Sequence, residues 1–194
     1  MQPLRSFELG RKAQTFSSEF ILAYIIFLLV LTAILFLWDT TNRSIITSER
    51  LYDMENSAIN AVEKLIRTPG MPNDWFSTSS TDDIISIGLA NKSRILDERK
   101  VLKFIELMST SGSSLCPTGI IGSNNYNCSR YLLGLGKYEF YFELMDINGT
   151  VLNLNGTQCA TGNSPHGDYE YMLTIWRSAI LNDEIVKIKF VVWK

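Results

Sequence analysis

Residues 20–38 read FILAYIIFLLVLTAILFLW and decide the architecture of this chain. The stretch carries no formal charge, and roughly 20 apolar residues in a helix cross a hydrocarbon core of about 30 Å. A secretory signal peptide is one alternative, but its apolar region has about 7–15 residues and ends at small side chains. Bulky Phe36, Leu37 and Trp38 close this stretch instead. A buried core helix, the other alternative, would normally show a polar stripe. We therefore predict one transmembrane helix.

The flanking charges predict the orientation of this helix. Arg5, Arg11 and Lys12 precede the span, whereas Asp39 and Arg43 follow it. Positively charged flanks remain cytoplasmic. We therefore expect a single-pass protein of the cell membrane, with the lipid bilayer as its first partner, the N-terminus in the cytoplasm and the C-terminal domain outside the cell.

Helical periodicity continues beyond the apolar stretch. Apolar residues recur at steps of three and four, with charged residues between them; they are Leu51, Met54, Ala58, Ala61 and Leu65. No Gly or Pro interrupts the chain between Thr15 and Thr68, and Pro69-Gly70 follows. The pattern predicts one helix over residues 15–68, first transmembrane and then amphipathic, whose apolar stripe needs a partner.

Residues 69–194 supply that partner as an extracellular α+β domain. Asp97 is a suitable N-cap for a helix whose buried face holds Val101, Leu102, Ile105 and Met108. Residues 109–127 are rich in Gly, Ser and Asn and are predicted to form a loop. The last third alternates between apolar and polar residues, as strands do; the predicted strands are 138–144, 151–154, 169–180 and 184–193.

Two turns connect these strands, at Asn148-Gly149 and Asn182-Asp183. They predict a small antiparallel sheet with one apolar face. The amphipathic half of the long helix would cover that face, giving an α+β fold.

The composition argues against several classes of function. The chain has 18 basic and 20 acidic residues, a net charge of −2, without the clustered basic residues of a nucleic-acid surface. Its one histidine, His166, lies in a polar segment, and no nucleophile elbow, P-loop or zinc-protease motif occurs. We expect no catalytic site, no cofactor and no metal, and an enzyme is the last of the functions considered.

The cysteines and glycosylation motifs all follow the span. Cys116 and Cys128 could close a short disulfide loop, which would leave Cys159 free or intermolecular. A metal site built from all three cysteines competes with this interpretation, although no C-x-x-C pair occurs. Possible glycosylation sites with the pattern Asn-x-Ser/Thr are Asn42, Asn91, Asn127, Asn148 and Asn155.

The segment from Arg11 to Phe20, RKAQTFSSEF, resembles the class III signal region of archaeal type IV pilin-like proteins. The resemblance implies that a prepilin peptidase cuts between Ala13 and Gln14 and removes a leader within residues 1–14. It also implies that Glu19 pairs with the N-terminal amine of a neighbouring subunit. Ala13 stands where Gly is commoner, and Glu19 is sixth from Gln14 where the family acid is usually fifth.

Looser similarity to archaeal membrane-anchored relatives extends through the rest of the chain, at residues 68–75, at 87–90 and at the C-terminal Val191-Val192-Trp193. The resemblance implies a minor filament or pseudopilin subunit with a structural role, whose partners are copies of itself or other pilin-like subunits. The alternative is an anchored extracellular binding or sensing domain that does not polymerise.

Overall fold

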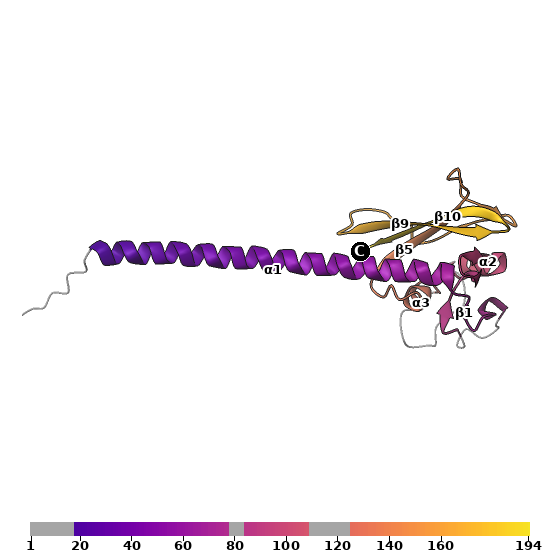
Figure 1. Cartoon of the computed structure of the whole chain (residues 1–194), viewed down its shortest axis with the longest axis horizontal. Coiled ribbons are helices and arrows are strands. Elements are labelled where there is room, and N and C mark those ends of the chain that lie inside the picture. The colour runs from indigo at the N-terminus through magenta and orange to yellow at the C-terminus, as the bar shows by residue number, and fades with distance from the viewer. Residues whose placement is uncertain (1–17, 78–83, 109–124) are drawn as a thin grey trace, which may run out of the picture. The chain divides into compact units, whose positions relative to one another are not determined.

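In a computed structural model, residues 18–77, 84–108 and 125–194 are described, and the chain divides into two compact units, Met1–Ser48 and Glu49–Lys194. One helix, α1 (Ser18–Arg67), runs through both units (Figure 1). Glu19 lies in its first turn, and Lys64 and Arg67 lie in its last turn. Each of these side chains has a charge opposite in sign to the helix-dipole end at which it lies, which stabilises the helix. The predicted helix is confirmed from Ser18 onward, and the predicted leader lies outside the described residues.

Short elements follow α1 before the main sheet is completed. They are β1 (Gly70–Met71), the 3-10 helix η1 (Trp75–Ser77), β2 (Ser86–Ile87), β3 (Ala90–Lys92), β4 (Ile95–Leu96), α2 (Glu98–Leu107) and α3 (Asn125–Leu132). Asp97 caps α2 as predicted, because its side chain accepts a hydrogen bond from the Arg99 amide. α3 begins inside the segment predicted to be a loop, so that boundary was wrong.

The remaining elements are strands: β5 (Glu139–Met145), β6 (Asn153–Leu154), β7 (Thr157–Gln158), β8 (Ala160–Gly162), β9 (Met172–Leu181) and β10 (Glu184–Trp193). Six strands form one sheet in the order β3-β4-β9-β10-β5-β8. The β9–β10 hairpin turns at Asn182 and Asp183, whose φ angles of 52° and 67° suit a two-residue type I′ turn. This hairpin was predicted correctly.

The sheet is mixed rather than wholly antiparallel. β4 runs parallel to β9 and pairs with it at Ile95 and Ile180. This pairing arises because Arg94, at φ 64°, turns β3 back into β4 and its carbonyl accepts the Ile180 amide at 2.8 Å. The α+β class, with a long helix packed on a small sheet, is confirmed.

The structure also differs from the prediction at residues 151–154, which were expected to form one strand returning beside residues 138–144. Val151 forms only an isolated bridge with Met145, and residues 153–158 then make a separate small hairpin, β6–β7. Asn155 and Gly156 have φ angles of 52° and 82°, which permit a second tight turn at this point. β5 pairs with β10 on one side, and on its other side it consequently pairs with β8.

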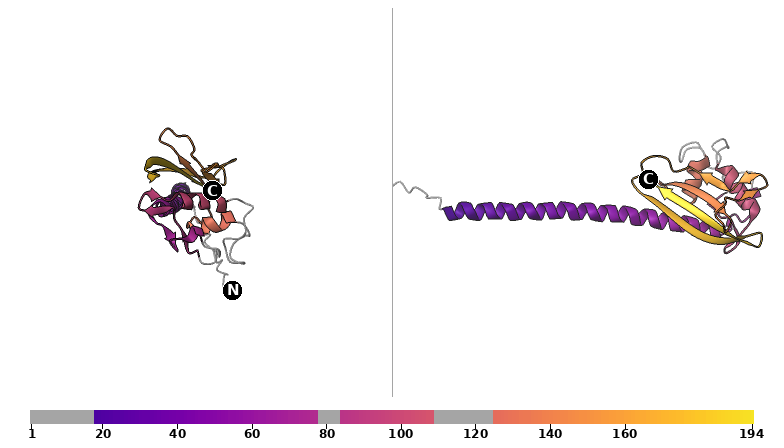
Figure 2. Two further views of the ribbon diagram at one scale, coloured as in Figure 1. Left: turned by 90° about the vertical axis from the view of Figure 1, so that its right-hand side faces the viewer. Right: turned by 90° about the horizontal axis from the view of Figure 1, so that it is seen from above.

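The core lies between the sheet and the C-terminal part of α1 (Figures 1 and 2). Phe140, Phe142 and Phe190 are fully buried on the sheet side. The α1 residues that face them are Met54, Ala58, Ala61, Val62, Leu65 and Ile66. Leu51, predicted to belong to this stripe, is 40% exposed. Val62 and Ile66 widen the stripe instead.

Backbone contacts fix the end of α1 to residues 88–94, a region that we call the joint. The carbonyl oxygens of Leu65, Ile66 and Thr68 accept the amides of Leu89, Arg94 and Ala90 at 2.8, 2.8 and 3.2 Å. The last carbonyls of a helix lack partners within the helix. The β3 region supplies partners for these three and so ties the helix end to the sheet.

Candidate functional site

The apolar stretch, residues 20–38, is a candidate membrane span and forms the first candidate site. It lies wholly within α1, and every residue in it is exposed. Among the described residues, no protein surface covers these side chains. Burial of apolar area is worth about 25 cal/mol per Å². The stretch therefore favours a lipid or protein environment over water, consistent with single-pass membrane anchoring.

Glu19 stands one residue before this span, in the first turn of α1. A carboxylate at a helix N-terminus is stabilised by the helix dipole by about 0.3–1 kcal/mol. This local role does not require a neighbouring subunit. Ala13 and Gln14, the residues of the predicted cleavage site, lie outside the described residues.

The cysteines differ in their chemical state. Cys128 lies in α3 and is disulfide-bonded, whereas Cys159 is free and buried. Burial raises the pKa of the Cys159 thiol and so disfavours the reactive thiolate. Cys116, predicted to pair with Cys128, lies outside the described residues.

The predicted glycosylation sites lie in different surroundings. Asn148 and Asn155 are exposed at tight turns, and Asn91 is exposed in the short strand β3. Asn127 is half-buried in α3, next to the disulfide-bonded Cys128. Asn42 is on α1, about 6 Å along the helix axis from Trp38. Asn155 Nδ2, the atom that would carry a glycan, donates a hydrogen bond to Glu98 Oε1 at 3.0 Å.

No constellation for catalysis is visible in the described part of the chain. His166 is exposed, and its Nδ1 lies 2.5 Å from the Ser164 carbonyl oxygen. No group of three His, Cys, Asp or Glu side chains is arranged to hold a metal among the described residues. Asp146 accepts the Thr150 amide at 2.8 Å, which lowers the pKa of this turn carboxylate.

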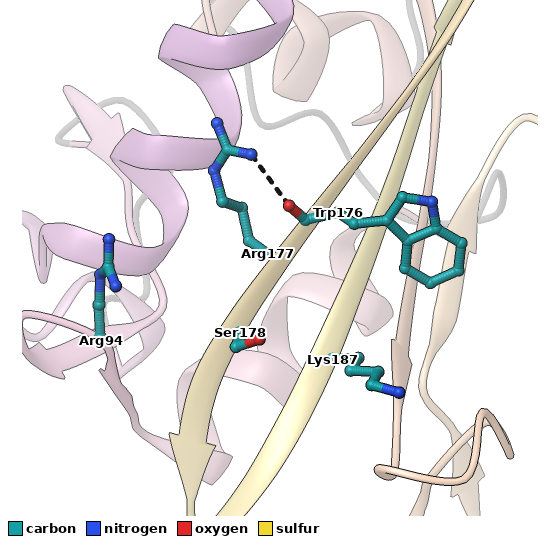
Figure 3. Close-up of a pocket in the computed structure, with 5 residues that line it drawn as sticks. All are labelled: Arg94, Trp176, Arg177, Ser178 and Lys187. Carbon is teal, nitrogen blue, oxygen red and sulfur yellow. Dashed lines mark hydrogen bonds between the residues drawn. The ribbon is translucent and has the colours of Figure 1, made fainter.

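A second candidate site is a shallow, open hollow of about 480 Å³ beside β9 (Figure 3). The described residues lining it are Arg94, Trp176, Arg177, Ser178 and Lys187. Three of these carry a positive charge and none is acidic. Trp176 is 53% exposed, which is unusual for a side chain of this size on a polar surface.

Two of the three cations have partners that hold them in place. Arg177 donates to Glu63 Oε1 at 2.7 Å and to the Trp176 carbonyl at 2.9 Å. The hydrogen bond from Arg177 lowers the pKa of Glu63, so this pair is ionised at neutral pH. Lys187 donates to the Ile147 carbonyl at 2.7 Å.

Sequence reasoning missed this hollow. Alternation along β9 could have marked Trp176 and Ser178 as outward-facing, but Arg94 and Glu63 are distant in sequence. Glu63 and Arg177 are separated by 114 residues.

No protein-family model, curated protein or solved structure matches this chain. The structure itself defines the class of the protein. It is an α+β domain on a long N-terminal helix, which carries one candidate membrane span.

Proposed function

We propose that the chain is a type IV pilin-like surface protein, anchored by its single span and acting as a minor filament or pseudopilin subunit with a structural role. One observation carries the proposal. A single uninterrupted helix contributes both the uncovered apolar span and the stripe that forms the core of the domain. Such a helix can hold a newly made subunit in lipid and later exchange lipid for the helices of neighbouring subunits.

The leader-like segment supports the same proposal. Arg11 and Lys12 would remain in the cytoplasm, the peptidase would cut after Ala13, and Gln14 would carry the new amine. Glu19 is five residues beyond Gln14 in the sequence, and by the resemblance its partner would be the amine of a neighbouring copy. Opposite charges in a low-dielectric bundle are less costly together than apart.

The first prediction concerns this processing. We expect the intact mass of the chain purified from its native membrane to lack residues 1–13. Ala13→Trp will retain them, because an indole replaces a methyl group at the cleaved bond, whereas the control Ser6→Trp will still be shortened. A wild-type chain that keeps Met1 to Ala13 contradicts the pilin-like proposal.

The basic hollow beside β9 favours a second function, an anchored binding domain that does not polymerise. The two functions differ in where the protein is found after cells are sheared. A filament subunit is released with surface filaments, whereas an anchored monomer stays with the membranes.

The second prediction separates these functions. We expect wild-type protein in the sheared filament fraction and Glu19→Gln only in membranes, since the amide cannot neutralise the neighbouring amine. Glu49→Gln, also an exposed α1 acid, is the matched control and should enter filaments. Wild-type protein confined to membranes would instead favour the anchored binding domain.

A further inference from the structure

β9 has a backbone edge that is open over most of its length. β9 pairs with β10 from Met172 to Leu181 without a break in register. On its other side it pairs with β4 only at Ile180, and no other described strand lies there (Figure 2). The stretch from Thr174 to Ser178 is therefore an unpaired edge within the described structure.

The backbone groups along this edge point away from β10. The Ile180 amide donates to the Arg94 carbonyl on the open side of β9. Strand residues two apart direct their N–H and C=O groups the same way. The backbone groups of Ser178, Trp176 and Thr174 therefore also face outward. Among these groups, the Trp176 carbonyl accepts a hydrogen bond from Arg177 Nη1 at 2.9 Å.

This edge lacks three of the features that usually prevent strand addition: short length, proline and a bulge. Natural edge strands carry prolines, bulges or inward charges, or are very short. β9 has ten residues, no proline and a regular register. Thr174, Trp176 and Ser178 are all exposed. Only Arg177, held by Glu63, places a charge along the edge.

The charges beside the edge indicate what kind of strand fits it. Arg94 and Arg177 lie on the side of β9 away from β10, and Lys187 lines the same hollow from β10 (Figure 3). A second copy added edge to edge would bring the same cations against these. Like charges across a strand pair are destabilising. A strand with acidic side chains would be attracted instead.

We propose that the β9 edge, Thr174 to Ser178, is a docking site for an extended acidic peptide of a partner protein. The peptide adds a strand to the sheet, with main-chain hydrogen bonds to the outward groups of Thr174, Trp176 and Ser178. Its carboxylates face Arg94, which lies on the open side of β9. This inference does not depend on whether the chain polymerises.

The third prediction tests this docking site. The probe is an end-blocked, fluorescently labelled peptide of alternating valine and glutamate, titrated against the full chain in detergent micelles. We expect saturable binding by fluorescence anisotropy and slowed amide exchange at Thr174, Trp176 and Ser178. Thr174→Pro, which removes an outward N–H, should weaken binding by about tenfold or more.

Matched controls distinguish binding at the β9 edge from nonspecific binding of the peptide. Thr174→Val keeps the backbone N–H and should bind as the wild type does. Arg94→Glu and a peptide with lysine in place of glutamate should each weaken binding about tenfold. Arg94→Glu also provides a test if Thr174→Pro lowers the melting temperature.

Three results would overturn the docking site. The first is no binding of the acidic peptide, and the second is equal affinity of Thr174→Pro in its folded form or of the lysine peptide. The third is a peptide-free dimer abolished by Thr174→Pro, because it would show that a second copy occupies the edge.

Discussion

Replacement of Gly88 by alanine is expected to destabilise the C-terminal unit by about 4 kcal/mol, close to the upper end for single substitutions. A Cβ at this position would lie 2.2 Å from the Thr68 carbonyl oxygen and 2.5 Å from the Gly70 amide nitrogen. Both contacts are with backbone, so relief requires the joint to open. Opening would also lengthen the Trp75 Nε1 hydrogen bond to the Gly88 carbonyl, now 2.9 Å.

Gly134→Ala is the matched control for this substitution. Gly134 has a φ of +82°, but no heavy atom would lie within 4 Å of its added Cβ. The expected loss is about 1–2 kcal/mol, the ordinary cost of left-handed backbone for a residue with a Cβ. Denaturant unfolding in mild detergent, followed by tryptophan fluorescence, measures both. Equal losses for the two variants would contradict a steric role for the joint.

Replacement of Lys100 by methionine should cost about 3 kcal/mol. Lys100 is 2% exposed, and its ammonium donates to the Pro69 carbonyl at 2.8 Å, to Asn73 Oδ1 at 2.9 Å and to the Ala90 carbonyl at 3.1 Å. Methionine has a similar length and no donor. It leaves these acceptors without a partner, at about 1–3 kcal/mol for each one that stays buried.

The charge of Lys100 has an opposite effect on stability. Burial lowers the pKa of Lys100, which means that the charged form is costly in the folded state. Methionine removes this cost, and buried charges replaced by apolar residues are sometimes neutral or stabilising. We expect the loss of stability to prevail because the ammonium donates to three acceptors, two of which are the main-chain carbonyls of Pro69 and of Ala90 at the joint.

Lys103→Met on the same helix is the control. Lys103 pairs with the exposed Glu106 at 3.0 Å, and a surface pair of this kind is worth about 0–1 kcal/mol. The same unfolding measurement should separate the two lysines clearly. A Lys100→Met variant as stable as the wild type would show that the hydrogen bonds of the Lys100 ammonium do not stabilise the folded state.

Much of the secondary structure was predictable because its signals are local. The apolar stretch, the absence of Gly and Pro between Thr15 and Thr68, and Asp97 before an amphipathic segment each specify a helix or its start. The β9–β10 hairpin follows from alternation on both sides of Asn182-Asp183. The β6–β7 hairpin has a similar local signal in Asn155-Gly156, a few residues after the turn at Asn148-Gly149.

The candidate sites were less accessible to sequence reasoning. Glu19 and the span could be located from the sequence, because both belong to one continuous segment. The basic hollow could not, since its residues come from the β3–β4 turn, β9 and β10, and each is an ordinary exposed strand or turn residue when taken alone.

The sequence by itself therefore determined the candidate membrane span, the long helix and the final hairpin, because hydrophobic content, periodicity and turn chemistry act over a few neighbouring residues. Only the tertiary structure decided that β4 lies parallel to β9, that Lys100 is buried at the joint, and that most of the β9 edge is left unpaired. These features depend on pairings between distant segments. Many strand orders satisfy the same local pattern, and packing around the end of α1 selects one of them.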